Sequence, residues 1–399
     1  MTSTKTISGR RLKNWLRHFV FRAVWLIAAV IGLAALPFGR RRGDFDRKSI
    51  SKILVIRLDL LGDLVLSLPA IQALHEAYPD ASISLLALPY TAPLFSQHPD
   101  LKQIFTFDVN RLRPSGEMLS PRPYRDLWNL LRRLRAEHFD LAVSLHGPWS
   151  SLFAFASGAP FRAGYRDESF PFMLNLAIPG KRYRQRRHEA DYCLDLAYSL
   201  GAPAGAYVPV LTPSPEAIAA IDRLIGKGLG DFVIIHPGAT NGAAKRWTST
   251  GMAALADKLI GGDNLKVVFT GSKGDLPVVE AVTKQMRCTP LVLAGKTTIP
   301  ELVALIARCR LLVSGDTGPM HIANALGVPV VAIHGPTDPA LSGPYGGSAT
   351  VVRHDVPCGP CYDLSEVADC PRHDPICMTS ITVEEVYAAA KRQIVGRHR

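Results

Sequence analysis

Several features are missing from this 399-residue sequence, and each absence removes a class of protein. It has no repeat of solenoid period and no low-complexity tract, and its hydrophobic fraction of 47% is too high for a disordered chain. No helix-turn-helix, zinc-finger or RNA-recognition signature accompanies its net charge of +12. Residues 1–48 hold 11 Lys/Arg against two Asp, so only +3 remains for the rest of the chain. We therefore expect no nucleic-acid partner.

Long apolar runs are also scarce, and one run alone could reach into a membrane. After Arg22, "AVWLIAAVIGLAALPFG" is free of charge over 17 residues, with basic residues before it and "RRR" at 40–42 after it. Such a helix spans roughly 25 Å, the short limit for crossing a bilayer, and basic flanks on both sides disfavour a single crossing. We expect residues 1–50 to form a membrane-associating segment with an apolar helix lying in one leaflet. A cleaved signal peptide and a buried core helix are the alternatives.

The remaining chain alternates short β-branched runs with helical stretches in two series. The expected strands are 52–58, 82–88, 103–107 and 140–145 in the first series and five runs, beginning "DFVIIHPG" and ending "VPVVAI", in the second. The expected helices are 62–78, 123–137, 248–260, 275–286 and 299–309. This alternation indicates parallel sheets wrapped by helices, with a proline-rich linker at 201–215. We place the domains at 51–205 and 206–380, facing across a cleft, and a terminal helix at 381–399.

The stretch "SGDTGPMHIANALGVPVVAIHGPTDP" joins two of these strands and carries several polar residues. Thr317 suits an N-cap, Pro319 the first helical turn and Gly327 a residue just past a helix end, which predicts a helix at 318–326. Asp316 then lies between the end of a strand and the start of a helix. Ligands bind at that edge of open parallel sheets, and a helix N-terminus there offers backbone N–H groups to an anion.

Two other strand ends carry candidate residues. The stretch "RLDLLGDL" begins with Arg57 and places Asp63 at a helix start, where it is either a cleft-facing carboxylate or an acid that complements the helix dipole. Its single Gly62 disfavours the G-x-G-x-x-G loop of nicotinamide enzymes.

In the second series, Thr240 and Asn241 form a polar loop, and Lys245 supplies a cation for a phosphate. A plain surface loop is the alternative there. Asp275 ends the next strand and is available to an adenine or ribose hydroxyl.

Cysteines and basic runs leave further questions open. Cys358, Cys361, Cys370 and Cys377 are spaced x2, x8 and x6. The Cys-x-x-Cys pair favours a metal over a disulfide, but x8 followed by x6 is not the spacing of a standard zinc ribbon. A structural zinc, unligated thiols and a redox-labile pair are the alternatives. The basic runs "RRLR" at 132–135 and "KRYRQRRH" at 181–188 are either solvated faces or contacts for an anionic acceptor or anionic lipid.

Taken together, "RLDLLGDLVLSLPAIQAL", "HPGATNGAAKRW" and "SGDTGPMHIANALGVPVVAIHGPTDP" resemble the motifs of family 9 glycosyltransferases, the bacterial lipopolysaccharide heptosyltransferases. The resemblance extends over about 52–390. It implies an α/β fold of two Rossmann-like domains in the GT-B architecture, an ADP-sugar donor, typically ADP-heptose, and transfer with inversion without a required cofactor. An anionic glycolipid acceptor would place the protein on the cytoplasmic face of the bacterial inner membrane.

The resemblance also implies roles for particular residues. Asp63 would be the general base, and Thr240 and Lys245 would lie at the donor diphosphate. The nucleotide sugar would be surrounded by Asp316, Thr317, Gly318 and His321, although a buried core histidine is the alternative for the last. The chain departs from the family where Asp275 replaces an expected Glu, and in its apolar N-terminal extension.

We assign acceptor contacts to Arg57, Arg182 and Arg184. Two other functions remain open: an epimerase or hydrolase of nucleotide sugars with the same fold, and a non-catalytic nucleotide-binding assembly factor at the membrane.

Overall fold

The structure is a computed structural model, and it describes residues 45–113, 117, 120–147, 149–180, 185–226, 229–239, 242–361 and 369–396. Almost all of the expected membrane-associating segment, residues 1–44, lies outside this part of the chain. Among the described residues, no helix combines the length and the apolar character needed to span a bilayer.

The chain divides into two compact units. The described parts of Met1–Leu60, Ala70–Gln185 and Tyr192–Tyr207 form the first unit. The second unit combines Leu61–Pro69, Arg186–Asp191 and Val208–Arg399. The "RLDLLGDL" stretch is thus shared, because its strand belongs to the first unit and its following helix to the second.

The first unit is built on a six-stranded parallel sheet with the order β3-β2-β1-β4-β5-β6. Its strands are β1 (Lys52–Arg57), β2 (Ser82–Ala87), β3 (Gln103–Thr106), β4 (Leu141–His146), β5 (Phe161–Tyr165) and β6 (Leu176–Ile178). Its helices include α3 (Leu68–Ala77), α4 (Pro121–Ala136), α5 (Ser150–Ala156) and α6 (Glu189–Ser199), with short turns η3 (Arg47–Ser49), η4 (Ala92–Phe95), η5 (Val109–Leu112) and η6 (Pro171–Met173). The first residues of α3 and of α6 are assigned to the second unit, and the rest of each helix belongs to the first.

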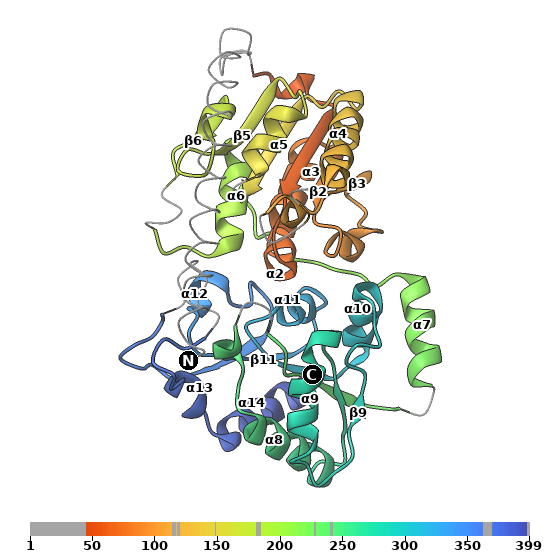
Figure 1. Cartoon of the computed structure of the whole chain (residues 1–399), viewed down its shortest axis with the longest axis vertical. Coiled ribbons are helices and arrows are strands. Elements are labelled where there is room, and N and C mark those ends of the chain that lie inside the picture. The colour runs from red at the N-terminus through yellow and green to blue at the C-terminus, as the bar shows by residue number, and fades with distance from the viewer. Residues whose placement is uncertain are drawn as a thin grey trace. The chain divides into compact units, whose positions relative to one another are not determined.

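The second unit repeats this plan with the strand order β12-β11-β10-β7-β8-β9 (Figure 1). Its strands are β7 (Phe232–His236), β8 (Lys266–Phe269), β9 (Leu291–Val292), β10 (Leu311–Gly315), β11 (Val330–His334) and β12 (Ala349–Arg353). Its helices are α2 (Leu61–Val65), α7 (Pro215–Ile225), α8 (Ser249–Gly261), α9 (Leu276–Thr283), α10 (Ile299–Arg308), α11 (Gly318–Ala325), α12 (Pro339–Ser342), α13 (Ile376–Thr379) and α14 (Val383–Gly396), with η7 (Ala243–Lys245) and η8 (Lys273–Asp275).

The central strands are almost entirely buried, as expected where helices cover both faces of a parallel sheet. In β1, β4, β7 and β11, every residue or all but one is buried. The two parallel α/β sheets confirm the fold class expected from the alternating pattern.

Two sequence expectations differ from the structure in detail. The helix expected at 62–78 is two helices, α2 and α3, because Pro69 lacks an N–H and its ring would clash with the carbonyl four residues earlier. Strands β5, β6 and β12 were not predicted. β5 contains an arginine and a glycine, β6 has only three residues, and β12 is an edge strand with no fully buried residue.

Candidate functional site

The strand order locates a ligand-binding edge in the second unit. The chain moves outward from β7 through β8 to β9 and then returns to β10 on the other side of β7. Such a reversal leaves a crevice at the carboxyl ends of the two strands concerned, where open α/β sheets bind their ligands. β7 ends at His236, and Asp316 follows directly after β10. The predicted importance of Asp316 therefore agrees with its place in the topology.

A buried ion pair occupies this edge. Lys245 Nζ lies 2.9 Å from Asp316 Oδ2, and the side chains are only 13% and 8% exposed. Gly315 makes the approach feasible, because a Cβ there would lie 2.8 Å from the backbone oxygen of Lys245. The glycine of the "SGD" motif thus brings the loop carrying the cation against the carboxylate.

The charges around Asp316 set its protonation state. Burial alone would raise its pKa, but the ammonium of Lys245 and the neighbouring His334 and His321 hold the pKa below the usual value. The carboxylate is therefore ionised at neutral pH. It fixes the position of the Lys245 ammonium beside the start of α11.

Helix α11 begins as the sequence predicted, with Thr317 at the N-cap position. The Thr317 side chain does not cap the helix; its hydroxyl lies 2.8 Å from Ser314 Oγ. The N-terminal end of α11, beginning at Gly318, thus presents its positive dipole end next to the Lys245–Asp316 pair.

His321 lies in the first turn of α11 and is 4% exposed. Its Nε2 is 4.0 Å from Asp316 Oδ1, and its Nδ1 has no hydrogen-bond partner among the described residues. Burial lowers the pKa of His321 to about 4 despite the nearby carboxylate, so the ring is neutral at pH 7. A neutral imidazole with an unused nitrogen can exchange a hydrogen bond with a phosphate or sugar oxygen.

Helices α2 and α11 lie next to each other (Figure 1), and two reciprocal glycine positions allow them to pack closely. A Cβ on Gly62 would lie 2.7 Å from His321 Cδ2, and a Cβ on Gly318 would lie 2.9 Å from Leu61 Cδ2. Each glycine therefore permits the other helix to approach. This contact brings Asp63, half-buried in the first turn of α2, to the helix that carries His321.

Two strand-end histidines at this edge were not singled out from the sequence. His334 ends β11, is fully buried, and has no partner for its Nε2 among the described side chains. His236 ends β7, and burial lowers its pKa to about 4 despite the opposing influence of Asp275. Both could have been found by asking which polar residue ends each apolar strand.

The other expected donor-site residues are placed differently. Thr240 and Asn241 lie outside the described residues, as do Arg182 and Arg184 of the expected acceptor contacts. Asp275 Oδ2 accepts hydrogen bonds from the backbone N and the hydroxyl of Ser272, at 2.8 and 2.7 Å, in a helix-capping arrangement.

Arg57 ends β1 in the first unit, as predicted, but its side chain is fully buried. Its Nη2 lies 3.3 Å from Asp59 Oδ2.

The four C-terminal cysteines together line one small cavity of about 20 Å³. Burial raises the pKa of the Cys377 and Cys361 thiols, and the neighbouring cysteines raise both further. In the described part of the chain, no three or more His, Cys, Asp or Glu side chains are arranged to hold a metal ion. The cysteines therefore share a cavity without forming a ready-made metal site.

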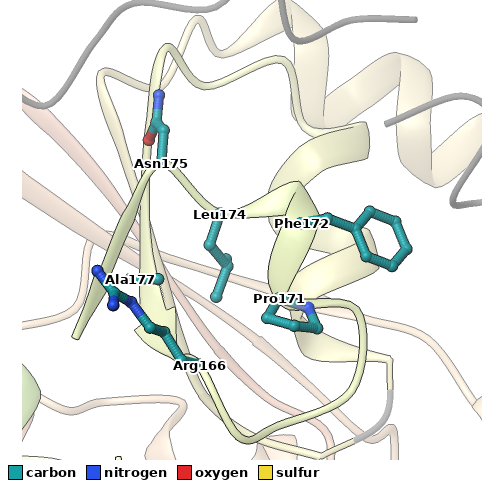
Figure 2. A pocket seen from close by; sticks show the side chains of 6 residues that line it. All are labelled: Arg166, Pro171, Phe172, Leu174, Asn175 and Ala177. Carbon is teal, nitrogen blue, oxygen red and sulfur yellow. The ribbon is translucent and has the colours of Figure 1, made fainter. Parts of the chain in front are cut away.

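A larger hollow of about 390 Å³ lies elsewhere, beside β5 and β6 in the first unit. Figure 2 shows Arg166, Leu174, Asn175 and Ala177 around it, with the Phe172 ring turned away. Among the described residues that line this hollow, Arg166 is the only titratable one. None of the lining residues lies at the strand ends where either sheet reverses its strand order. We assign the hollow no part in the chemistry.

Comparisons with known proteins agree with the fold and identify the family. The family model of glycosyltransferase family 9 (heptosyltransferase) matches residues 127–370. Lipooligosaccharide heptosyltransferase 2 of Haemophilus influenzae is 32% identical over 316 residues, which is 75% of this chain and 88% of that protein.

Solved structures give the same result. A family 9 glycosyltransferase from Veillonella parvula matches with a TM-score of 0.75 at 26% identity, covering 88% of this chain and 99% of that one. ADP-heptose lps heptosyltransferase II of E. coli matches with a TM-score of 0.71 at 25% identity, covering 87% and 100%. A family match over more than half of the sequence, with a relative above 30% identity, establishes that the chain belongs to glycosyltransferase family 9, the heptosyltransferase family.

Proposed function

We propose that this enzyme transfers heptose from ADP-heptose to a lipopolysaccharide-core acceptor with inversion at the anomeric carbon. The relatives named as heptosyltransferases supply the donor and acceptor class. The observation that carries the proposal is the buried Lys245–Asp316 pair beside the N-terminus of α11, with α2 packed on that helix. In this proposal the second unit binds the donor and the first unit binds the acceptor, as in an enzyme of the GT-B architecture.

The donor diphosphate is assigned to Lys245 and to the first turn of α11. An ammonium and a helix N-terminus together stabilise the negative charge that develops on departing ADP, and neither needs a metal ion. His321, being neutral, donates or accepts one hydrogen bond with a phosphate or sugar oxygen. Thr240 and Asn241 are proposed as further polar contacts to the donor, together with Thr317 and Gly318.

Asp63 is assigned the role of general base. The acceptor hydroxyl oxygen forms a bond to the anomeric carbon while the bond from that carbon to the diphosphate oxygen breaks. Asp63 takes the hydroxyl proton as the attack proceeds, and ADP leaves with the bonding electron pair. Half-burial in the first turn of α2 keeps this carboxylate beside the donor-binding helix.

A transfer assay read by mass spectrometry tests this assignment. Purified full chain is mixed with ADP-heptose and a deacylated inner-core acceptor in the presence of EDTA, and the acceptor should gain the mass of one heptose. Asp63→Asn should lower the rate by about 10²-fold or more, with donor binding retained. Asp80→Asn, an exposed carboxylate change in the first unit, serves as the control and should be neutral.

The assay also separates the two alternative functions. An epimerase or hydrolase would consume ADP-heptose without any acceptor. An assembly factor would bind the nucleotide and give no turnover with either substrate. Full transfer by Asp63→Asn would refute the assignment of the base.

We propose that the enzyme works at the cytoplasmic face of the inner membrane, in contact with anionic lipid. Helix α4 supports this, because its outer face exposes Trp128 by 61% and Tyr124 by 49%. Its arginines are Arg122, Arg125, Arg132, Arg133 and Arg135, against one acidic residue, Asp126. Amphipathic aromatic rings favour the headgroup region, and each Arg near an anionic surface contributes about 1 kcal/mol.

Vesicle sedimentation tests the membrane proposal. The full chain should bind vesicles containing phosphatidylglycerol more tightly than vesicles of phosphatidylcholine alone, and salt should weaken the binding. Trp128→Ser should reduce this binding. Val395→Ser, a matched change of a 63% exposed apolar residue on α14, should leave it unchanged. Equal loss in both variants would contradict a docking role for α4.

We further propose a structural zinc ion held by Cys358, Cys361, Cys370 and Cys377, with no cofactor needed for catalysis. Support comes from the cavity that the four side chains line together and from the Cys-x-x-Cys spacing of the first two. Binding must draw the sulfur atoms closer together. Elemental analysis of the purified chain should find one zinc per chain, lost in Cys361→Ser and Cys370→Ser. A metal-free protein that is as stable as the wild type would contradict this.

A further inference from the structure

The first unit carries a buried histidine–glutamate pair that none of the assigned roles uses. His146 Nδ1 lies 2.8 Å from Glu168 Oε1, and the backbone N of Gly147 donates to Glu168 Oε2 at 3.2 Å. The Glu168 side chain is 3% exposed, whereas that of His146 is 16% exposed. Both carboxylate oxygens are therefore engaged by the protein, and the histidine ring lies between the carboxylate and solvent.

The backbone around the pair is shaped to hold it. Gly147 adopts a φ of +106°, a conformation that other residues rarely accept, and this conformation accompanies the donation of its N–H to Glu168. The hydroxyl of Ser150 donates to the backbone oxygen of His146. The ring is thus held at one nitrogen by a side chain, and the adjoining backbone is held by one contact at His146 and one at Gly147.

The pair lies at the topological switch point of the first sheet. The chain runs outward from β1 through β2 to β3 and returns to β4 on the other side of β1. His146 is the last residue of β4 and pairs in register with Arg57, the last residue of β1. An open parallel sheet binds its ligand at this place, so a built polar pair here indicates a binding site.

The chemistry of the pair specifies the ligand. A carboxylate only accepts hydrogen bonds, so His146 Nδ1 must carry a proton and donate it. Its Nε2 then lies on the opposite side of the ring from the carboxylate. No hydrogen bond to Nε2 is present among the described residues. A hydroxyl group can both donate and accept a hydrogen bond, so a ligand with hydroxyl groups fits this nitrogen.

We propose that His146 exchanges a hydrogen bond with a sugar hydroxyl of the acceptor through Nε2, and that Glu168 is a positioning residue which fixes the ring. This inference rests on the proposed transferase function and names a binding residue for its acceptor. Neither residue takes part in the proton transfer assigned to Asp63. Their loss should therefore act on acceptor binding and leave donor binding intact.

Two substitutions of His146 separate ligand binding from a merely structural role. Asn places its amide near the former Nδ1, so His146→Asn keeps a donor for Glu168 and loses the group at Nε2. Gln places its amide near the former Nε2, so His146→Gln keeps a hydrogen-bonding group for the ligand and loses the one facing Glu168. Ligand binding predicts that Gln retains more acceptor affinity than Asn. A structural role predicts that Asn is the better tolerated.

The experiment measures KM for the deacylated acceptor, KM for ADP-heptose and kcat in the full chain. His146→Asn should raise the acceptor KM about ten-fold, the value of one hydrogen bond, with the donor KM within two-fold of wild type. His146→Gln should raise it less, and Glu168→Gln should resemble His146→Asn with a smaller effect.

His75→Asn is the control, because it removes the ring nitrogen that faces a carboxylate in a more exposed pair of the same unit, with His75 Nε2 3.8 Å from Asp100 Oδ1.

Each outcome decides the proposal separately from the transferase assignment. Heptose transfer by the wild type supports the function whatever the variants do. If His146→Asn then matches the His75→Asn control in all three constants, the acceptor site is refuted. It is also refuted if the donor KM rises as much as the acceptor KM, or if Asn outperforms Gln. If the wild type transfers no heptose, each variant is titrated with the same deacylated acceptor and its affinity is measured directly. A higher affinity in His146→Gln than in His146→Asn then supports the acceptor site, and the reverse order refutes it.

Discussion

The contact between α2 and α11 can be tested with a single methyl group. Gly62→Ala places a Cβ 2.7 Å from His321 Cδ2 and 3.2 Å from His321 Nε2, whereas ordinary van der Waals contact begins at 3.4 Å. The His321 ring is 4% exposed and cannot swing into solvent. Either the ring shifts within a packed interior or α2 lifts from α11, and both changes move groups assigned to the donor and the base.

The expected size of the effect follows from two opposing terms. Inserting a methyl group into a packed interior costs about 1–3 kcal/mol. Replacing a helical glycine by alanine stabilises the folded state by up to about 1 kcal/mol, because alanine has the higher helix propensity. The net loss of about 1 kcal/mol corresponds to a fall in Tm of roughly 2–4 °C for a domain of this size class. Activity should suffer more, because a displacement near 1 Å in a catalytic site can lower kcat/KM about 10²-fold.

The assay compares Tm and kcat/KM for Gly62→Ala with those for Gly261→Ala. Gly261 ends helix α8 in the same unit, and a Cβ there meets nothing nearer than Cys288 Sγ at 3.8 Å. That control should keep full activity. Gly318→Ala should reproduce the Gly62→Ala loss, and the double variant should lose less than the sum, because separated helices accept the second methyl group at little cost. Wild-type activity in Gly62→Ala would refute the close packing of α2 on His321.

Three further predictions concern the charges of the donor site. Lys245→Met should raise the donor KM about 10²-fold and destabilise the protein by about 3–5 kcal/mol, since it leaves Asp316 buried and unpaired; Asp316→Asn in that background should restore Tm but not activity. His236 and His321 have pKa values lowered to about 4 in the folded state, so the unfolded chain binds protons first as pH falls from 6.5 towards 4. Tm should therefore decrease across that window, by the equivalent of about 3 kcal/mol per histidine, and His236→Gln should flatten the decrease. Asp275→Asn should change the donor KM less than about three-fold, because its carboxylate is engaged in a helix cap; a ten-fold rise would assign it to the nucleotide.

The strands and the site loops were predictable because their signals are local. β-branched runs bounded by Gly and Pro located nine of the strands within a residue or two, and the N-cap, proline and glycine signals located α11. The role of Asp316 followed from one local fact, that it stands where a strand ends and a helix begins. Local signals failed for β5 and β12, whose sequences carry polar residues or a glycine because these strands lie at or near a sheet edge.

Contacts between distant segments were not predictable from a single sequence. Nothing in "LLGDL" indicates that its glycine meets His321, because the reason for that glycine is a side chain on another helix. Gly315 is similar, since its lack of a side chain makes room for the backbone of Lys245. The histidines at 146, 236 and 334 were overlooked for a different reason: the strand-end rule was applied to acidic residues and not to every polar residue that ends a strand.

When every polar residue that ends a strand is considered, the two sheets differ in a way that matches the substrates proposed for the two units. At the second switch point the strand ends bring together Asp316, the Lys245 ammonium and the positive end of α11, a combination suited to a diphosphate. At the first switch point, β4 ends in His146, which is held by a buried carboxylate and whose Nε2 is suited to a hydrogen bond with a hydroxyl. A transferase must bind its leaving group through cations and its nucleophile through hydrogen bonds. We infer that one sheet topology, used twice with different residues at the strand ends, divides these two tasks between the units.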